Sequence, residues 1–189
     1  MRNIIILGGN GYVGRELTAQ WLAHDPRAEF WIVCRSGKNC INNPRVHVIE
    51  ANARDVKTVE SMLPNDTQFA AIIDLVGDQT NMARNVQAAK STLALAKRHA
   101  IPRIGYIAGC AGNARYRRTK RSIVKHLRDY DPNVVIINPS IIYGKDRNDA
   151  LVRLVPLFRR LSRVCPCMAP LTVDDVASEL LRGLTPLGK

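Results

Sequence analysis

The chain alternates short apolar runs with longer segments whose apolar residues recur at helical spacing. Ile4–Leu7 is continuously apolar, which is typical of a strand buried on both faces of a parallel sheet. Met82–His99 instead places Val86, Ala89 and Leu93 on one face of a helix. These two kinds of segment follow one another along most of the chain, and they predict its secondary structure.

The apolar runs predict strands over Ile4–Leu7, Phe30–Cys34, Val46–Glu50, Ala70–Val76, Ile104–Ala108 and Val134–Asn138. The periodic segments predict helices over Arg15–Ala23, Val56–Leu63, Met82–His99, Arg117–Tyr130, Ala150–Leu161 and Val173–Leu184. Because strands and helices alternate, we expect an α/β fold, a Rossmann-like doubly wound parallel sheet. A single domain should span residues 1–189, with residues 145–189 forming a reduced C-terminal substrate region.

A glycine-rich loop separates the first predicted strand from the first predicted helix. Such a loop needs glycine for a tight turn, for close approach of a pyrophosphate and for packing of helix against strand. The free N–H groups of the helix N-terminus then attract the phosphates. The loop therefore predicts a bound dinucleotide, and the alternative is a turn that merely joins two elements. The residues expected to contact the dinucleotide are Gly8, Asn10, Gly11, Tyr12, Val13 and Gly14.

The residue that ends the second strand of a Rossmann unit faces the adenosine ribose, where an acid favours NAD and a base favours NADP. Here Cys34 is followed by Arg35 and Ser36, and no acid occupies the position. A guanidinium makes forked contacts to phosphate, and Ser36 and Lys38 add donors. The sequence therefore favours NADP(H), with NAD(H) as the alternative. Arg35 could also simply cap an exposed loop.

The composition narrows the class of protein. The hydrophobic fraction of 46% is ordinary for a soluble globular protein, and no apolar run reaches the ~20 residues of a membrane span. The first apolar run is too short for a signal peptide, so we expect a cytoplasmic protein. Five cysteines are an odd number, which indicates reduced thiols. The Cys165-Pro166-Cys167 segment lacks the usual zinc spacing, and no metal site is expected.

The net charge of +12 is concentrated in the second half of the chain. The densest basic cluster comprises Arg115, Arg117, Arg118, Lys120, Arg121, Lys125 and Arg128. Charge alone gives only non-specific attraction to nucleic acid, and no aromatic stacking platform accompanies the cluster. A solvated helix face, or a docking surface for an acidic protein over residues 115–128, is the favoured interpretation. Pairing of two copies through the helices near 82–99 and 117–130 would place this charge against itself.

Six segments in the same order match one protein family. They are the glycine loop, Asn52-Ala53-Arg54-Asp55-Val56, Asp74-Leu75-Val76-Gly77, Tyr116-Arg117-Arg118-Thr119-Lys120, Asn138-Pro139-Ser140-Ile141-Ile142-Tyr143-Gly144 and Leu171-Thr172-Val173-Asp174-Asp175-Val176-Ala177. The chain thus resembles the extended and atypical short-chain dehydrogenase/reductases, which include NAD-dependent epimerase/dehydratase-like and NmrA-like proteins.

The resemblance implies further cofactor contacts. It places Asp55 and Val56 against adenine, and Leu75, Val76 and Gly77 over the cofactor ribose. On the nicotinamide side it implies contacts with the segment that contains Pro139 and Ile141. Asp74, which interrupts an apolar strand, is either a structural polar residue or part of the cofactor cleft.

Tyr116 and Lys120 have the YxxxK spacing, which puts both side chains on one helix face. A lysine beside a tyrosine stabilises phenolate and lowers the phenol pKa. Such a tyrosine can exchange a proton with a carbonyl or alcohol while a hydride moves to or from nicotinamide. The resemblance therefore implies Tyr116 as the acid/base, and Lys120 as its partner and as a contact of the nicotinamide ribose. The alternative is a tyrosine that precedes a basic helix by chance.

Three departures from the family pattern keep a second function open. The fifth strand ends in Ala108-Gly109-Cys110, where the family usually has serine or threonine. Only five residues separate Cys110 from Tyr116, which could leave Tyr116 in a loop, and only 45 residues (189 − 144) follow Gly144. We expect an oxidoreductase acting on a small carbonyl or alcohol. The alternatives are an inactive dinucleotide-binding regulator or accessory subunit and, least favoured, a nucleic-acid-binding module.

Overall fold

The fold is built on a six-stranded sheet, seen in a computed structural model that describes residues 2–38, 40–144, 152–165 and 168–185. The strands lie in the order β3-β2-β1-β4-β5-β6, and every neighbouring pair is parallel. Their bounds are β1 Arg2–Leu7, β2 Ala28–Cys34, β3 Val46–Glu50, β4 Phe69–Asp74, β5 Ile104–Ile107 and β6 Val135–Ile137.

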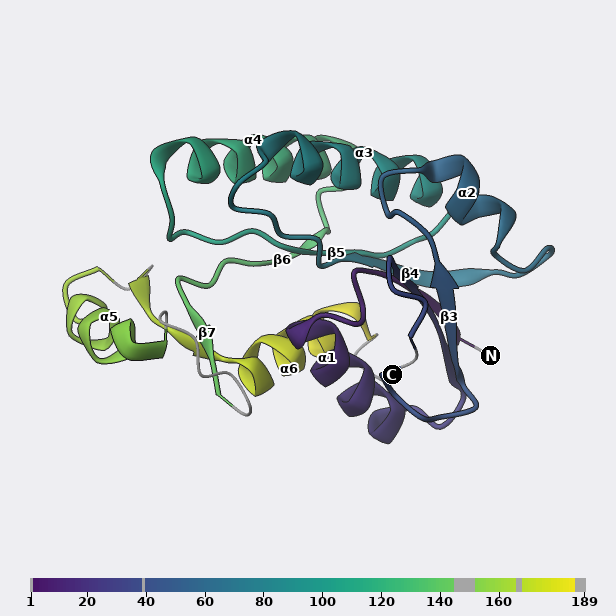
Figure 1. Ribbon diagram of the computed structural model, residues 1–189, viewed down its shortest axis with the longest axis horizontal. Helices are drawn as coiled ribbons and strands as arrows, with labels where there is room; N and C mark the ends of the chain where they lie inside the picture. Colours follow the sequence, from purple (N-terminus) through teal and green to yellow (C-terminus); the bar gives the residue numbers. More distant parts are fainter. Residues whose placement is uncertain (1, 39, 145–151, 166–167, 186–189) are drawn as a thin grey trace.

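Helices cover both faces of the sheet, so the expected Rossmann-like fold is confirmed (Figure 1). On one face lie α2 (Val56–Ser61), α3 (Met82–Arg98) and α4 (Ala114–Tyr130). On the other lie α1 (Tyr12–His24) and α6 (Val173–Leu184), which pack against each other. No helix in the described residues has both the length and the apolarity needed to cross a membrane.

Successive side chains of β1 point to opposite faces of the sheet, and both faces are covered, so all of them are apolar from Ile4 to Leu7. Ile4 and Ile6 join the core on the α1 and α6 face, whereas Ile5 and Leu7 join the core under α3 and α4. All four side chains are fully buried, as expected for a strand between two helical layers.

The sheet reverses its winding at β1, which pairs with β2 on one side and with β4 on the other. In open α/β sheets, ligands bind at the carboxyl ends of the strands beside such a reversal. The loop that leaves Leu7 is therefore at the position where this fold type places a site.

The last helix closes the sheet face opposite α3 and α4. Thr172 caps α6 through a reciprocal capping box with Asp175, which accounts for the acidic pair Asp174-Asp175 at this helix start. Val176 and Leu180 are fully buried in the core beneath α1. The C-terminal segment thus completes the core of the dinucleotide-binding-type sheet.

At two boundaries that differ from the expected ones, a side-chain hydrogen bond explains the difference. The β4 strand ends at Asp74 rather than Val76, because the Asp74 carboxylate accepts the Val76 N–H at 2.9 Å and turns the chain away from the sheet. Helix α4 begins at Ala114 rather than Arg117, because Asn113 caps it by accepting the Tyr116 N–H at 2.8 Å.

The C-terminal region contains elements that the sequence pattern did not reveal. Strands β7 (Ile142–Tyr143) and β8 (Leu171–Thr172) form a separate parallel pair too short to show an alternating pattern. The expected helix over 150–161 appears as the 3-10 turn η1 (Val152–Leu154) and helix α5 (Val155–Leu161). Residues 150 and 151 lie outside the described ranges, as does Cys167 of the Cys165-Pro166-Cys167 segment.

Candidate functional site

The glycine loop at the end of β1 is held by its own backbone. Gly8 has φ +78°, and its N–H donates to Val33 O at 2.9 Å while its carbonyl accepts from Gly11 N at 3.0 Å. A Cβ on Gly14 would lie 2.2 Å from Gly9 O, so the start of α1 sits directly against the loop. A Cβ on Gly9 would lie 2.8 Å from Ile32. The loop therefore needs glycine for a turn and for two close approaches.

Two cavities meet at this loop. The first, of about 390 Å³, extends toward the ends of β2 and β3, and the second, of about 310 Å³, extends toward the start of α4. Both are lined by Gly8, Gly11, Leu75, Val76 and Gly77. The loop after β1 and the turn after β4 thus join them into one elongated cleft at the carboxyl ends of the strands.

The first cavity gathers basic residues from three elements. Arg35 and Ser36 follow β2, Arg54 follows β3, and Arg84 comes from the first turn of α3. Arg35 is exposed and forms no ion pair within the part of the chain that the structure describes. The sequence patterns singled out Arg35 and Ser36 but missed Arg54 and Arg84, since only the fold brings these to the same cavity.

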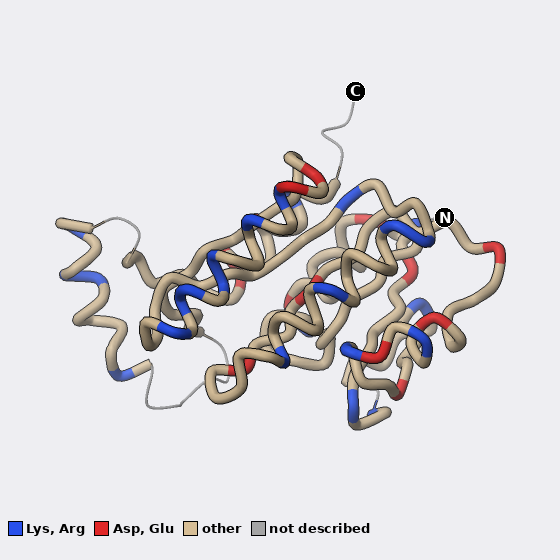
Figure 2. Tube along the Cα trace, turned by 90° about the horizontal axis from the view of Figure 1, so that it is seen from above, with Lys and Arg blue, Asp and Glu red and all other residues tan. Residues whose placement is uncertain are grey.

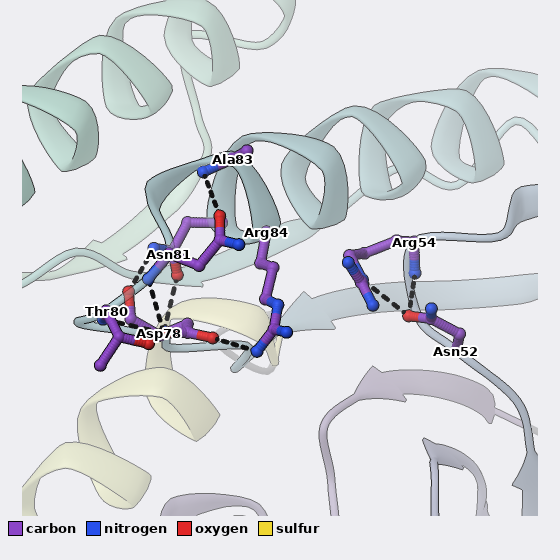
Figure 3. Close-up of polar contacts among 8 residues, drawn as sticks. Asn52, Arg54, Asp78, Thr80, Asn81, Ala83 and Arg84 are labelled. Atoms are coloured by element: carbon purple, nitrogen blue, oxygen red, sulfur yellow. Dashed lines mark hydrogen bonds and ion pairs between the residues drawn. The ribbon is translucent and has the colours of Figure 1, made fainter.

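Among the described residues, Asp78 is the one acid that lines the first cavity. Its carboxylate accepts hydrogen bonds from the Thr80 hydroxyl and N–H, from the Asn81 N–H and from Arg84 at 2.9 Å (Figure 3). These bonds, led by that of the Thr80 side chain, hold the pKa of Asp78 well below its usual range. Asp78 is therefore a negative charge that fastens the loop before α3 and holds Arg84 beside the cavity.

Arg54 is held at the opposite wall of the same cavity. Its Nε donates to Asn52 Oδ1 at 2.9 Å, so the side chain is folded back onto the loop after β3 (Figure 3). The cavity is consequently lined by three guanidinium groups against the single carboxylate of Asp78. This excess of positive side chains suits an anionic group.

The second cavity contains Tyr116 and Lys120. Tyr116 lies in the first turn of α4. The expectation that its short distance from Cys110 could leave it in a loop is therefore wrong. The two side chains are 8% and 2% exposed, and they line the cavity together with Tyr12, Val13 and Gly14. The early start of α4, set by the Asn113 cap, is what moves Tyr116 out of the loop.

Lys120 sits in a buried polar cluster beneath this cavity. Its ammonium donates to Ile107 O at 3.0 Å and lies 4.6 Å from the centre of the Tyr106 ring. Burial lowers the pKa of Lys120 to about 8, and the negative charge of Asp74 opposes that shift. Burial likewise raises the pKa of Asp74 to about 6, against the Val76 hydrogen bond and the charge of Lys120.

Tyr106 belongs to the same cluster and was not anticipated from the sequence. It is paired in register with Asp74 on the neighbouring strand, and burial followed by the Asp74 charge raises the pKa of its phenol. Tyr106 OH and Asp74 Oδ2 are both buried without a hydrogen-bond partner among the described residues. The register of two parallel strands, which no sequence pattern gives, brings them together.

The pKa of the Tyr116 phenol is raised, whereas the sequence predicted that Lys120 would lower it. Burial raises that pKa, and the Lys120 ammonium lies 5.7 Å from the ring centre. Tyr116 therefore keeps its proton at neutral pH, which suits a proton donor rather than a resident phenolate.

Four of the residues expected to contact the cofactor do not line the two joined cavities. Asp55 and Val56 line a separate cavity between α2 and α3, and Asp55 caps α2 by accepting from Thr58. Pro139 and Ile141 are buried and line neither half of the cleft. Ile142 lines the second cavity instead, one residue later along the extended segment.

Asn10 and Tyr12 tie the glycine loop to its surroundings. Asn10 lines the first cavity, and its amide donates to Lys38 O and to Cys34 Sγ, which fixes it toward the end of β2. Tyr12 OH donates to Gly144 O, which ties α1 to the chain beyond β7. The loop thus has a rigid frame on both sides of the cleft.

The residues that line the two joined cavities fit a dinucleotide. The loop has no side chain where a phosphate would approach Gly8 and Gly11, and the N-terminus of α1 points there. Cavities on both sides offer room for the two nucleosides. Gly8, Asn10, Gly11, Arg35 and Ser36 would hold one half, and Tyr12, Val13, Gly14 and Lys120 the other.

Solved structures share this fold at low sequence identity. The Bordetella bronchiseptica enzyme WbmH in complex with NAD+ superposes with TM-score 0.76 and 15% identity, covering 100% of this chain and 73% of that one. A UDP-glucose 4-epimerase has TM-score 0.74 and 14% identity, covering 97% and 72%. A Rossmann-fold NAD(P)-binding family protein from Shigella flexneri has TM-score 0.72 and 13% identity, covering 100% and 89%.

The family is established from the sequence. No curated protein matches the chain significantly. The model of the NAD dependent epimerase/dehydratase family, however, matches residues 4–101, which include the glycine loop, the turn after β4 and α3. The chain belongs to the NAD-dependent epimerase/dehydratase family.

Proposed function

We propose that this chain binds NADP(H) in the joined cavities and acts as an oxidoreductase on a small carbonyl or alcohol. The observation that carries the proposal is the second cavity, in which Tyr116 and Lys120 line the same space as the glycine loop. A proton-donating phenol beside the nicotinamide position is what carbonyl reduction requires.

The preference for NADP(H) is supported by the charges around the first cavity. Arg35, Arg54 and Arg84 line it, and the one carboxylate there, Asp78, is already engaged by Arg84. A ribose 2′-phosphate adds negative charge at this end, which arginine receives with forked hydrogen bonds. NAD(H) is the alternative, since the solved structure of WbmH is a complex with NAD+.

In the proposed reaction the cofactor supplies the hydride. Tyr116 holds the proton that a carbonyl oxygen would receive, because burial raises its pKa and keeps the phenol protonated. Lys120, whose ammonium donates to Ile107 O, would offer its remaining protons to the nicotinamide ribose. Ala108 and Gly109, which follow β5, offer no hydroxyl to orient the substrate, so this role would pass to other polar residues of the cavity such as Tyr116.

The test is NADPH consumption with a panel of small aldehydes and ketones, for the wild type and two variants. Tyr116→Phe should abolish turnover while NADPH still binds. Tyr130→Phe, at the exposed far end of α4, should leave turnover unchanged. Undiminished turnover in Tyr116→Phe would reject the proton-donor role.

A non-catalytic accessory subunit is the second candidate, and the outer side of α4 favours it. Six basic side chains of this helix are exposed, with Asp129 as its one acid. Basic positions recur in a row along the length of the helix in Figure 2, with other residues between them. Such a row fits an acidic protein surface. The exposed basic side chains of α4 are Arg115, Arg117, Arg118, Arg121, Lys125 and Arg128.

Two measurements separate this candidate from the enzyme. Tight NADPH binding without turnover on any carbonyl, together with salt-sensitive binding of a polyglutamate peptide, would support the accessory role. Stronger binding of duplex DNA than of the peptide would point to nucleic acid instead. A cytoplasmic location and the oligomeric state stay predictions, to be checked by cell fractionation and by sedimentation.

A further inference from the structure

Helix α5 stands at one end of the molecule, apart from the two helical layers (Figure 1). Its buried side chain is Val155, and Arg159 fastens it to the body by donating to the Tyr143 hydroxyl at 2.8 Å. The Arg159 guanidinium also lies 5.4 Å from the centre of the Tyr143 ring. The helix is therefore attached to the rest of the protein by defined contacts, while much of its surface is exposed to solvent.

The solvent side of this segment is apolar. Leu154 is 41% exposed, Leu157 52%, Leu161 40% and Val164 90%, which makes four of the six large exposed apolar residues of the described chain. Helical winding continues to Val164, whose N–H donates to Leu161 O at 3.1 Å. At 3.6 residues per turn these four side chains fall within an arc of about 80°.

The rest of the helix surface is basic. Residues 152–165 contain four arginines and no acid. At the same helical spacing the arginines fall beside and opposite the apolar arc. The four are Arg153, Arg159, Arg160 and Arg163. A short helix with an aliphatic arc and an arginine-rich remainder has the composition of helices that lie in the interface of a lipid bilayer.

We propose that α5 docks on an anionic lipid surface. Leu157, Leu161 and Val164 would enter the boundary between headgroups and acyl chains. The arginine stems extend along that boundary so that the guanidinium groups reach lipid phosphates. Charge complementarity carries the choice of partner, because every charged side chain of the segment is positive.

Two other occupants fit the same face less well. Leucine and valine seldom supply the binding energy of protein interfaces, and the apolar arc of this helix is formed of leucine and valine without an aromatic side chain. A second copy of the chain would bring four arginines against four arginines. A bilayer with negative headgroups satisfies both the aliphatic arc and the charge.

Docking here would place the cleft near the membrane. Tyr143, which receives Arg159, follows Ile142, and Ile142 lines the second cavity. The proposal does not depend on the cofactor, because none of Leu157, Arg160, Leu161 and Arg163 lines either cavity.

The test is co-sedimentation of the full chain with vesicles of phosphatidylglycerol and phosphatidylcholine, compared with vesicles of phosphatidylcholine alone. The wild type should bind the anionic vesicles preferentially, and binding should weaken as salt is raised. Leu157→Ser with Leu161→Ser should weaken binding at least tenfold. Arg160→Gln with Arg163→Gln should weaken it about thirtyfold.

Matched controls show whether α5 itself is responsible. Met62→Ser removes an exposed apolar side chain at the end of α2, and Arg118→Gln with Arg121→Gln removes two charges from α4. Both should bind vesicles like the wild type, and thermal unfolding should show that every variant is folded.

Three results would overturn the proposal. Equal binding to neutral vesicles would remove the role of the arginines. An equal loss in the α4 double variant would assign binding to overall charge rather than to α5. A wild-type dimer that Leu157→Ser with Leu161→Ser converts to a monomer would make this face a self-interface.

Discussion

The ammonium of Lys120 lies 4.6 Å from the centre of the Tyr106 ring, inside the protein and beneath the proposed nicotinamide position. Asp74, the register partner of Tyr106, supplies the negative charge of this cluster. Three elements thus contribute a cation, an aromatic face and a carboxylate, each of them 1–2% exposed. The charge state of Lys120 is therefore set jointly by burial and by Asp74.

NADPH affinity should decrease as the pH rises through about 8, because Lys120 loses its proton there and with it a donor to the cofactor. Asp74→Asn keeps an acceptor for Val76 N–H but removes the charge that holds the Lys120 pKa up, so the midpoint should move to lower pH. Lys120→Arg should flatten the profile, since arginine stays charged. Calorimetric titration from pH 6 to 10 measures all three, and identical profiles would exclude Lys120 from the cofactor site.

The same cluster should give a characteristic dependence of stability on pH. Asp74 has a raised pKa, so the folded state takes up its proton before the unfolded state, and stability increases as pH falls from about 6 toward the ordinary value of 3.8. Lys120 has a lowered pKa, so stability increases as pH rises from about 8 toward 10.5. The cluster should therefore lower the stability of the fold most between about pH 6 and pH 8.

Removing both charges should lower the free energy of unfolding by less than the sum of the two single changes. Asp74→Asn leaves the Lys120 charge buried without its counter-charge, and Lys120→Met leaves that of Asp74. The double variant leaves neither. We expect a coupling free energy of about 1 kcal/mol from urea unfolding at pH 7. Strict additivity would show that Asp74 and Lys120 do not interact.

Arg35→Asp should reverse the cofactor preference. Loss of a charge-assisted contact should weaken NADPH binding about tenfold to hundredfold, and the new carboxylate should favour the ribose hydroxyls of NADH. Arg27→Asp makes the same change of charge at the opposite end of β2 and serves as the control. If both variants lose equal NADPH affinity, overall charge rather than a 2′-phosphate contact explains the preference.

Gly14→Ala should destabilise the fold by about 1–3 kcal/mol, because the added Cβ would lie 2.2 Å from Gly9 O. It should also weaken dinucleotide binding, since the loop must move away from α1. Gly77→Ala is the control for stability, because a Cβ there meets no atom within 4 Å. Equal urea midpoints for the two variants would contradict the close packing.

The sheet could be predicted from the sequence because buried parallel strands leave continuous apolar runs such as Ile4–Leu7. The start of α4 could not, since Ala114 and Arg115 give no apolar signal and Asn113 acts through a cap. The short strands β7 and β8 could not be predicted either, because two residues cannot show an alternating pattern.

The glycine loop, Arg35, Tyr116 and Lys120 were found because each lies at a fixed distance along the chain from a recognisable element. Arg84 was missed because only the packing of α3 brings it to the cleft. Tyr106 was missed because only the register of β4 with β5 places it beside Asp74. The Asp55 side chain caps α2, and its expected contact with adenine stays a prediction. Sequence motifs locate residues along elements, whereas contacts between elements require the fold.

The central claim is that the joined cavities hold NADP(H), and calorimetric titration of the wild type with NADPH and then with NADH tests it most directly. We predict saturable one-to-one binding of NADPH, at least tenfold tighter than that of NADH. Failure of both dinucleotides to bind would contradict the site, and equal or tighter binding of NADH would contradict the role given to Arg35.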